Sequence, residues 1–238
     1  GNIVGSNIAN LFLIMGVSGL LTELHLSKPE MKEQAIWHLI LTLLLIFVLT
    51  REAYSPLSAS LLAIFFFVYM GKTYRKMKKD KISEEADPDK SPLPLMVVVK
   101  LILGFAFLYG GGELLVVSGS KLGRLLGIKE YVISAIFVAF GTSLPELITA
   151  LIACWKKKDA DLITGNIIGS NIFNVAFVLA SLGGYTMVFD RTFNFEIMVL
   201  LGASLFLLFL ASLKKNFFRI SGGAFLLVYA GVIWKLIS

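Results

Sequence analysis

The chain has 238 residues, of which 57% are hydrophobic and 16% are charged, and its mean hydropathy is +0.82. Soluble globular domains are less apolar and carry about a quarter of charged residues, so this composition excludes that class and indicates a membrane protein. The net charge of +6 therefore does not indicate nucleic-acid binding, and the single cysteine, Cys154, excludes an internal disulfide and a thiolate metal cluster.

Eight apolar stretches are long enough to cross a membrane as helices, which takes about 20 residues each. They lie at 3–22, 33–50, 56–74, 95–120, 131–155, 162–182, 193–213 and 218–237. The predicted fold class is therefore an all-α integral membrane protein. Before the second stretch, Ser27 and Glu30 have capping-box spacing around Pro29, which predicts a helix start there. His25 and His38 are too scattered to form a metal site, so a structural role is predicted for both.

The longest polar segment of the chain, RKMKKDKISEEADPDKSPLP, spans 75–94. Its composition predicts a linker between two halves, residues 1–74 with three spans and residues 95–238 with five. Basic residues predict the orientation, because loops rich in lysine and arginine stay in the cytoplasm. With the linker inside, 15 basic residues lie on the cytoplasmic side and six outside, which places the C-terminus outside. The inner set is Lys28, Lys32, Lys72, Arg75, Lys76, Lys78, Lys79, Lys81, Lys90, Lys156, Lys157, Lys158, Lys214, Lys215 and Arg219, and the outer set is Arg51, Lys121, Arg124, Lys129, Arg191 and Lys235.

One decapeptide occurs twice, as GNIVGSNIAN at 1–10 and as GNIIGSNIFN at 165–174, with eight of ten residues identical. On the predicted topology the two copies cross the membrane in opposite directions, which indicates an inverted repeat of the kind found in secondary transporters. Close helix packing would explain the glycines of both copies. It would not require serine and asparagine at the same offsets, where they share one helix face and present oxygen ligands or interhelical hydrogen bonds. These residues are Ser6, Asn7, Asn10, Ser170, Asn171 and Asn174.

The segment VAFGTSLPELITA, residues 138–150, places the carboxylate of Glu146 inside an apolar span. An ionisable side chain at that depth costs about 2.5–3.5 kcal/mol on insertion scales and is usually functional. Pro145 lacks an N–H, so the carbonyl of Gly141, and with it that of Ala139, is expected to be freed from the helix. Thr142 and Ser143 add hydroxyl oxygens, with Thr142 four residues before Glu146 on the same helix face. Such a set of hard oxygen ligands suits Ca²⁺ or Na⁺.

Taken together, GTSLPE at 141–146 and the paired decapeptides resemble the two alpha repeats of the sodium/calcium exchanger (cation/Ca²⁺ antiporter) superfamily. The stretch GGGELLVVSGSKLGRLLGI, residues 110–128, is similar to the gating helix of that family. The resemblance implies ten helices in two inverted halves, a cation site at mid-membrane and exchange of Ca²⁺ for Na⁺ by alternating access. Carried over to this chain, the implied ligands are Thr142, Ser143, Glu146, Ser170, Asn174 and the Ala139 carbonyl from the second repeat, with Ser6 and Asn10 from the first. Some relatives have aspartate at position 174, so asparagine removes one charge and leaves the coupling ion open.

By the same resemblance, a partner of GTSLPE should precede residue 1, so we expect the chain to lack the first gating helix and the helix with the first acidic motif. The missing helices would be needed for a complete site, and eight of ten expected spans are present. Glu113 lies toward the outer end of its span, where a role in the ion pathway is a weaker alternative. We expect no enzyme activity and no cofactor. The expected partners are the transported ions and the lipid bilayer, without nucleic acid, and the expected location is a prokaryotic inner membrane. A proton-coupled or K⁺-dependent cation antiporter is the alternative function.

Overall fold

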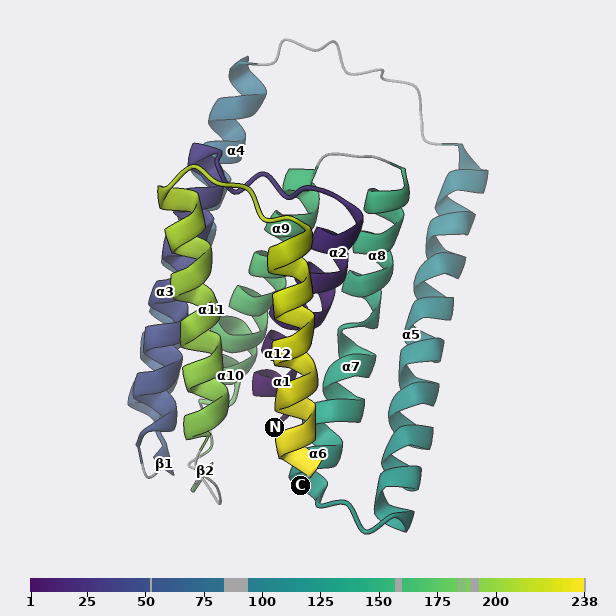
Figure 1. Ribbon diagram of the computed structural model, residues 1–238. Coiled ribbons are helices and arrows are strands. Elements are labelled where there is room, and N and C mark those ends of the chain that lie inside the picture. The colour runs from purple at the N-terminus through teal and green to yellow at the C-terminus, as the bar shows by residue number, and fades with distance from the viewer. Residues whose placement is uncertain are drawn as a thin grey trace.

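The computed structural model describes residues 1–51, 53–83, 94–156, 160–183, 185, 187–188 and 193–237 as a bundle of helices that run roughly side by side (Figure 1). Two spans each contain a six-residue π-helix between two α-helices. The first is α1 (Asn2–Ile8), η1 (Ala9–Ile14) and α2 (Met15–Leu21), and the second is α9 (Ala160–Ile172), η3 (Phe173–Val178) and α10 (Leu179–Ser181). A third span is broken into α6 (Glu130–Ile133), η2 (Ser134–Val138), α7 (Ala139–Thr142) and α8 (Leu144–Trp155). The remaining helices are α3 (Pro29–Leu49), α4 (Pro56–Ser83), α5 (Leu95–Leu125), α11 (Asn194–Ser212) and α12 (Arg219–Ile237).

The eight predicted membrane spans are confirmed. Seven described helices are long and apolar enough to cross a membrane, and the pair Glu130–Thr142 and Leu144–Trp155, bent by 45°, adds an eighth. The predicted capping box is wrong, because Lys28 is the N-cap of α3 and no side chain caps it. The Ser27 N–H instead donates to the Asn216 side-chain oxygen at 3.4 Å. The predicted linker begins later than expected, since α4 continues to Ser83, and 84–93 lies outside the described residues.

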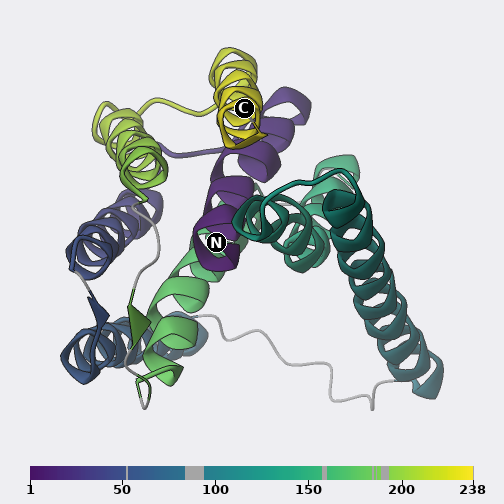
Figure 2. The same ribbon diagram turned by 90° about the horizontal axis from the view of Figure 1, so that it is seen from below.

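Helix α5 stands apart from the rest of the bundle (Figure 2). It contacts α6, η2, α7 and α8, and most of its large apolar side chains are exposed. An apolar helix with so much exposed hydrocarbon surface is stable in lipid, where its backbone is fully hydrogen-bonded within the helix and its side chains match the solvent. Close approach to the broken span occurs at glycines of α5, because an added Cβ on Gly119 would lie 2.4 Å from Phe137 Cδ1 and one on Gly123 2.8 Å from Ile133 Cγ1. An added Cβ on Gly112 would lie 3.0 Å from the Gly141 carbonyl oxygen.

The two copies of the decapeptide lie in equivalent spans of opposite direction. In Figure 1 the first span runs upward from α1 to α2, whereas the second runs downward from α9 to α10. The π-helices η1 and η3 are separated by the same 164 residues as the two motif copies, so the local distortion of the helix is repeated along with the sequence. π-Helical turns are rare and occur frequently at functional sites. The inverted repeat is therefore present in the backbone as well as in the sequence.

Short strand pairings at both ends of the bundle follow the same symmetry. At one end β1 (Ala53–Tyr54) pairs antiparallel with β2 (Met187–Val188), so that Ala53 faces Val188. At the other end Leu24 forms a bridge with Phe217. Leu24 and Val188 are equivalent positions of the repeat, and so are Ala53 and Phe217, because the members of each pair are 164 residues apart. The pairing of Leu24 with Phe217 is therefore the repeat equivalent of the pairing of Val188 with Ala53. These bridges tie the loops of one half to the loops of the other.

The equivalent glycines of the two motif copies have different surroundings. A Cβ on Gly5 would lie 2.5 Å from the Ala135 carbonyl oxygen and 2.9 Å from the Ala135 Cα, because α1 packs directly against η2. A Cβ on Gly169, its counterpart in α9, would meet no described atom within 4 Å. Gly5 is thus required for helix contact, whereas Gly169 borders open space.

We expect Gly5→Ala to destabilise the protein by about 1–3 kcal/mol, the usual cost of forcing an extra methyl group into a packed contact. Gly169→Ala is the matched control, and it should change stability by less than about 0.5 kcal/mol, as substitutions outside packed contacts usually do. Thermal unfolding of the purified protein in detergent measures both. An equal loss for Gly169→Ala would show that this face of α9 is covered by protein in the membrane.

Candidate functional site

The break between α7 and α8 positions Glu146. Helix α7 ends at Thr142, Ser143 has φ −92° and ψ 1°, and α8 starts at Leu144 with Pro145 in its first turn. Proline is favoured there because its missing N–H has no partner at the start of a helix. Glu146 also lies in this first turn, where the helix dipole stabilises a carboxylate. The sequence therefore places one negative charge at a helix start in the middle of a membrane span.

The Glu146 carboxylate lines an open pocket of about 360 Å³. All other residues that line this pocket belong to the second decapeptide. They are Gly165, Asn166, Gly169, Ser170, Phe173 and Asn174. The Ser170 hydroxyl donates to Glu146 Oε1 at 3.2 Å, and the Asn174 amide donates to Ser6 Oγ at 3.4 Å. The structure thus brings Glu146, Ser170 and Asn174 together, with Ser6 of the first motif copy beside them.

Three oxygens of the predicted ligand set are buried without a hydrogen-bond partner among the described residues. They are Glu146 Oε2, Ser143 Oγ and Asn10 Oδ1. Asn10 lies in η1, which contacts both α8 and α9, so its helix packs against those that carry Glu146 and Ser170. A buried polar atom without a partner costs about 1–3 kcal/mol, and native proteins keep few of them. A bound cation would satisfy such oxygens.

Two expectations about the helix break are wrong. The Ala139 carbonyl is not freed, because the Ser143 N–H donates to it at 3.1 Å and also to Phe140 O at 3.2 Å. The expectation for the Gly141 carbonyl, whose helical donor Pro145 lacks, stays a prediction.

Thr142 and Glu146 do not share a helix face, because the 45° bend falls between them. The Thr142 hydroxyl donates to the backbone carbonyls of Val138 and Ala139, both at 3.0 Å. Thr142 lines a separate pocket of about 240 Å³ together with Glu113, which is exposed on α5. Thr142 therefore faces α5, which carries Glu113, and lies away from the pocket that Glu146 shares with Ser170.

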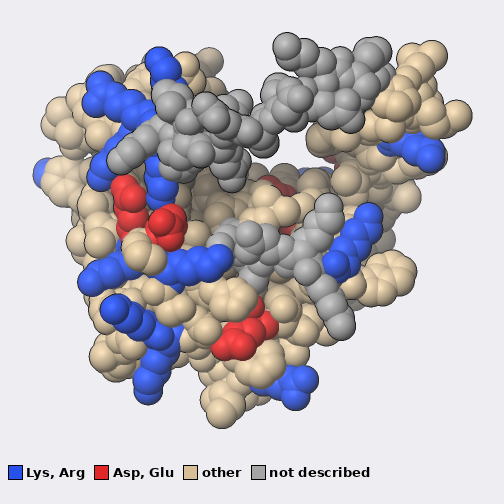
Figure 3. Space-filling view, turned by 90° about the horizontal axis from the view of Figure 1, so that it is seen from above, with Lys and Arg blue, Asp and Glu red and all other residues tan. Residues whose placement is uncertain are grey.

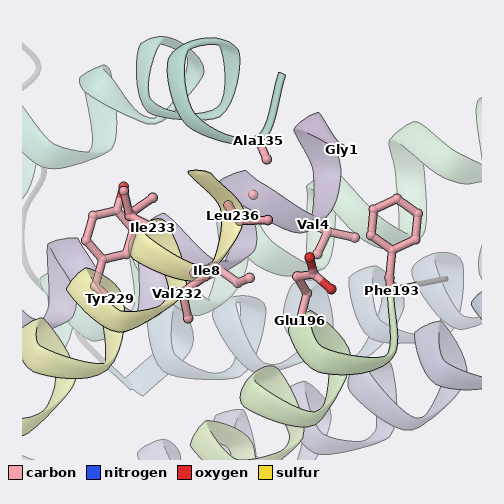
Figure 4. A pocket seen from close by; sticks show the side chains of 11 residues that line it. Gly1, Val4, Ile8, Ala135, Phe193, Glu196, Tyr229, Val232, Ile233 and Leu236 are labelled. Atoms are coloured by element: carbon pink, nitrogen blue, oxygen red, sulfur yellow. The ribbon is translucent and has the colours of Figure 1, made fainter. Parts of the chain in front are cut away.

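A further buried carboxylate, Glu196, was not singled out from the sequence. It lies in the first turn of α11 and is 3% exposed. Figure 4 shows it among the mainly apolar side chains that line a small pocket, including Val4, Phe193 and Leu236. An acidic residue inside the apolar stretch 193–213 was the signal that could have identified it. This pocket shares no lining residue with the one at Glu146.

Comparisons with known proteins agree with this fold. A family model described as sodium/calcium exchanger protein matches residues 1–74 and 96–237. The membrane protein MJ0091 of Methanocaldococcus jannaschii is 31% identical over 99% of this chain and 76% of its own length. CaxA of Alkalimonas amylolytica, which is named as an antiporter, is 31% identical over 100% of this chain and 78% of its own length. A solved structure of the sodium-calcium exchanger NCX_Mj superposes with a TM-score of 0.77 at 29% identity, over 98% of this chain and 75% of that chain.

Because one Glu146 oxygen is buried and unpaired, removing its charge should stabilise the empty protein. We expect Glu146→Gln to raise the free energy of unfolding by about 1–2 kcal/mol in buffer without Ca²⁺ or Na⁺, since an uncompensated buried charge is costly. Glu113→Gln, at an exposed carboxylate, should leave it unchanged. Chemical denaturation in detergent with choline as the only cation measures both variants, and a destabilised Glu146→Gln would contradict the unpaired geometry.

Proposed function

Because this chain belongs to the sodium/calcium exchanger family, we propose that it is a secondary antiporter that exchanges Ca²⁺ for Na⁺ by alternating access. The family consists of transporters, and the eight spans make the chain a multi-pass membrane protein. Inverted repeats of this kind support alternating access, because two similar halves can exchange the conformations that open the site to each side. The halves proposed here are residues 1–74 and 95–238, joined by the linker 75–94.

The observation that carries the proposal is the group of unsatisfied oxygens around the helix break. Glu146 Oε2, Ser143 Oγ and Asn10 Oδ1 are buried and unpaired within the described part of the chain. Ser170 and Asn174 line the same pocket as Glu146. Carboxylate, hydroxyl and amide oxygens are hard ligands, which Ca²⁺ takes in flexible sets of six to eight. We therefore propose Glu146, Ser143, Ser170, Asn174, Ser6 and Asn10 as cation ligands, with Thr142 and the Ala139 carbonyl as weaker candidates.

We propose Na⁺ rather than a proton as the coupling ion, because Glu146 is the one member of the proposed ligand set that could take up a proton. A proton-coupled antiporter needs a group that takes up a proton during the cycle. Asn174 is a neutral amide whose N–H donates to Ser6 Oγ at 3.4 Å, so it cannot serve this purpose. The amide oxygen of Asn174 can coordinate either Na⁺ or Ca²⁺. Proton or K⁺ coupling remains the alternative, with Glu146 as the group that would bind the proton.

The charge distribution supports an orientation with the linker in the cytoplasm. Figure 3 views the end of the bundle that carries the last turns of α4 and the loops before α3 and α12, and lysine and arginine gather on this face. The described basic residues at or near this end (Figure 1) are Lys28, Lys32, Lys72, Arg75, Lys76, Lys78, Lys100, Lys156, Lys214, Lys215 and Arg219. At the opposite end they are Arg51, Lys121, Arg124, Lys129 and Lys235. By the positive-inside rule we propose that the C-terminus faces outward, with a prokaryotic plasma membrane as the location.

Glu146→Gln keeps the size and hydrogen bonding of the side chain but removes the charge that replaces the hydration of a divalent cation. We expect Ca²⁺ uptake into proteoliposomes, driven by a Na⁺ gradient, to fall about 10- to 150-fold, since interactions with charged groups contribute about 1.5–3 kcal/mol and their loss leaves the cation undercompensated. Glu113→Gln is the control and should retain most of the activity. Uptake by Glu146→Gln at the parent's rate would mean that this carboxylate is structural.

Asn174→Asp should make Ca²⁺ transport more sensitive to acid. The substitution places a second carboxylate at the pocket of Glu146, and two like charges in one desolvated site favour protonation of one of them. Transport at saturating Ca²⁺ should therefore decline at a higher pH than in the parent. Asn174→Ala removes an oxygen without adding charge, so it should weaken Ca²⁺ affinity and leave the pH profile unchanged. Overlapping profiles for Asn174→Asp and the parent would place Asn174 outside the site of Glu146.

A further inference from the structure

A buried chain of hydrogen bonds connects α11 to the first decapeptide, and the geometry points to His38 and Ser204 as positioning residues that fix which end of the Asn10 amide is presented to the cation. The inference rests on the proposed function, since it concerns a ligand of the proposed cation site. The hydrogen-bonded residues come from four spans: Ser204 from α11, His38 from α3, Asn171 from α9 and Asn10 from η1.

All links of this chain are short and shielded from solvent. Ser204 Oγ donates to the Leu200 carbonyl at 2.8 Å and lies 2.9 Å from His38 Nδ1. His38 Nε2 lies 3.1 Å from Asn171 Nδ2, and Asn10 Nδ2 donates to Asn171 Oδ1 at 3.0 Å. Ser204, Asn171 and Asn10 are 0% exposed, and His38 is 2% exposed. Polar groups buried to this degree are costly unless each finds a partner, so the chain has one strongly preferred arrangement of its hydrogens.

The Asn171 end of the hydrogen-bond chain determines its direction. Ser204 Oγ, which donates to the Leu200 carbonyl and lies 2.9 Å from the Thr42 hydroxyl, can accept from His38 Nδ1–H. A neutral imidazole with Nδ1–H has an unprotonated Nε2, which accepts from the Asn171 amide. Asn171 Nδ2 also faces the Asn7 carbonyl at 3.5 Å, a second group that can only accept. In the opposite direction Asn171 would turn its oxygen toward this carbonyl, so that two acceptors would face each other.

The direction of the chain decides the role of Asn10. Because Asn171 presents its oxygen, Asn10 must present its NH₂ group, and this leaves Asn10 Oδ1 as the buried oxygen that has no partner among the described residues. Asn174, the counterpart of Asn10 in the second motif copy, likewise uses its NH₂ group for a hydrogen bond within the protein, because it donates to Ser6 Oγ. Both asparagines thereby offer oxygen to a cation. A flipped Asn10 amide would point N–H donors at the cation instead, and such a group cannot coordinate it.

The tautomer of His38 tests the direction without any transport assay. The sequence contains two histidines, so the variant His25→Gln leaves His38 as the single imidazole in a ¹⁵N-histidine solid-state NMR spectrum of the protein in lipid. We expect the shifts of a neutral ring with Nδ1 protonated and Nε2 unprotonated. A ring with the proton on Nε2 would reverse the chain and overturn the inference, whatever the transported ion is.

Transport kinetics test the effect on Asn10. His38→Phe keeps a ring but removes the acceptor for Asn171, so the KM for Ca²⁺ should rise about tenfold, the loss expected for one hydrogen bond or ligand to a charged group, with Vmax little changed. His38→Gln, whose side-chain oxygen can accept from Asn171, should restore most of the affinity. Thr42→Val is the matched control on α3. The Thr42 hydroxyl lies 2.9 Å from both the His38 carbonyl and Ser204 Oγ, but it does not lie between Ser204 and Asn10 in the series of hydrogen bonds. The KM of this variant for Ca²⁺ should therefore match the parent's.

A double-mutant cycle separates positioning from general packing. In an Asn10→Ala background the His38→Phe substitution should have no further effect on KM, because the ligand through which His38 acts is gone. A rise of the same size in both backgrounds, or an unchanged KM in His38→Phe alone, would overturn the inference while leaving the proposed function intact. Absence of Ca²⁺ uptake by the parent in the same assay would overturn the proposed function and this inference with it.

Discussion

The absence of water in the hydrocarbon core of a membrane is the constraint on which the rest of this structure depends. Every buried polar group must find a partner within the protein, and most do so here, as the Ala139 carbonyl does with the Ser143 N–H at the end of α7. Against this background an unpaired oxygen is informative. Three of them, on Glu146, Ser143 and Asn10, belong to residues that the motifs had already singled out. These three oxygens thus agree with the site that the motifs predict.

The inverted repeat explains how one short sequence can supply two sides of such a site. The same 164-residue shift relates the decapeptides, the π-helices η1 and η3 and the two strand pairings, so the symmetry extends from the sequence to the loops. The equivalent residues nevertheless play different parts. Gly5 packs against Ala135, whereas Gly169 borders the pocket of Glu146, and Ser170 donates to Glu146 whereas Ser6 donates to the Ile3 carbonyl. Similar halves in different surroundings are what alternating access requires, because the two states differ in which half is closed.

Much of this architecture was predictable from the sequence, because apolar length and an exact-spacing motif are one-dimensional signals. The eight spans and the opposite directions of the two motif copies required nothing more. The position of Thr142 was not predictable, since the helical periodicity that put it beside Glu146 fails at the 45° bend between α7 and α8. The role of His38 was not predictable either. A lone histidine carries no motif, and its partners Asn171 and Ser204 are 133 and 166 residues away.

The neutral residue at position 174 connects the charge of the site to the orientation of its amides. Among the described residues that line this pocket, Glu146 carries the formal negative charge, and Asn166, Ser170 and Asn174 contribute only dipoles. A carboxylate can turn either oxygen to a cation, but an amide is a ligand in only one of its two orientations, and the other repels the ion. A site that replaces carboxylates with asparagines therefore needs structure behind it to hold each amide the right way round. The buried link from Asn10 through Asn171 to His38 provides this for one asparagine, and Ser6 provides it for the other.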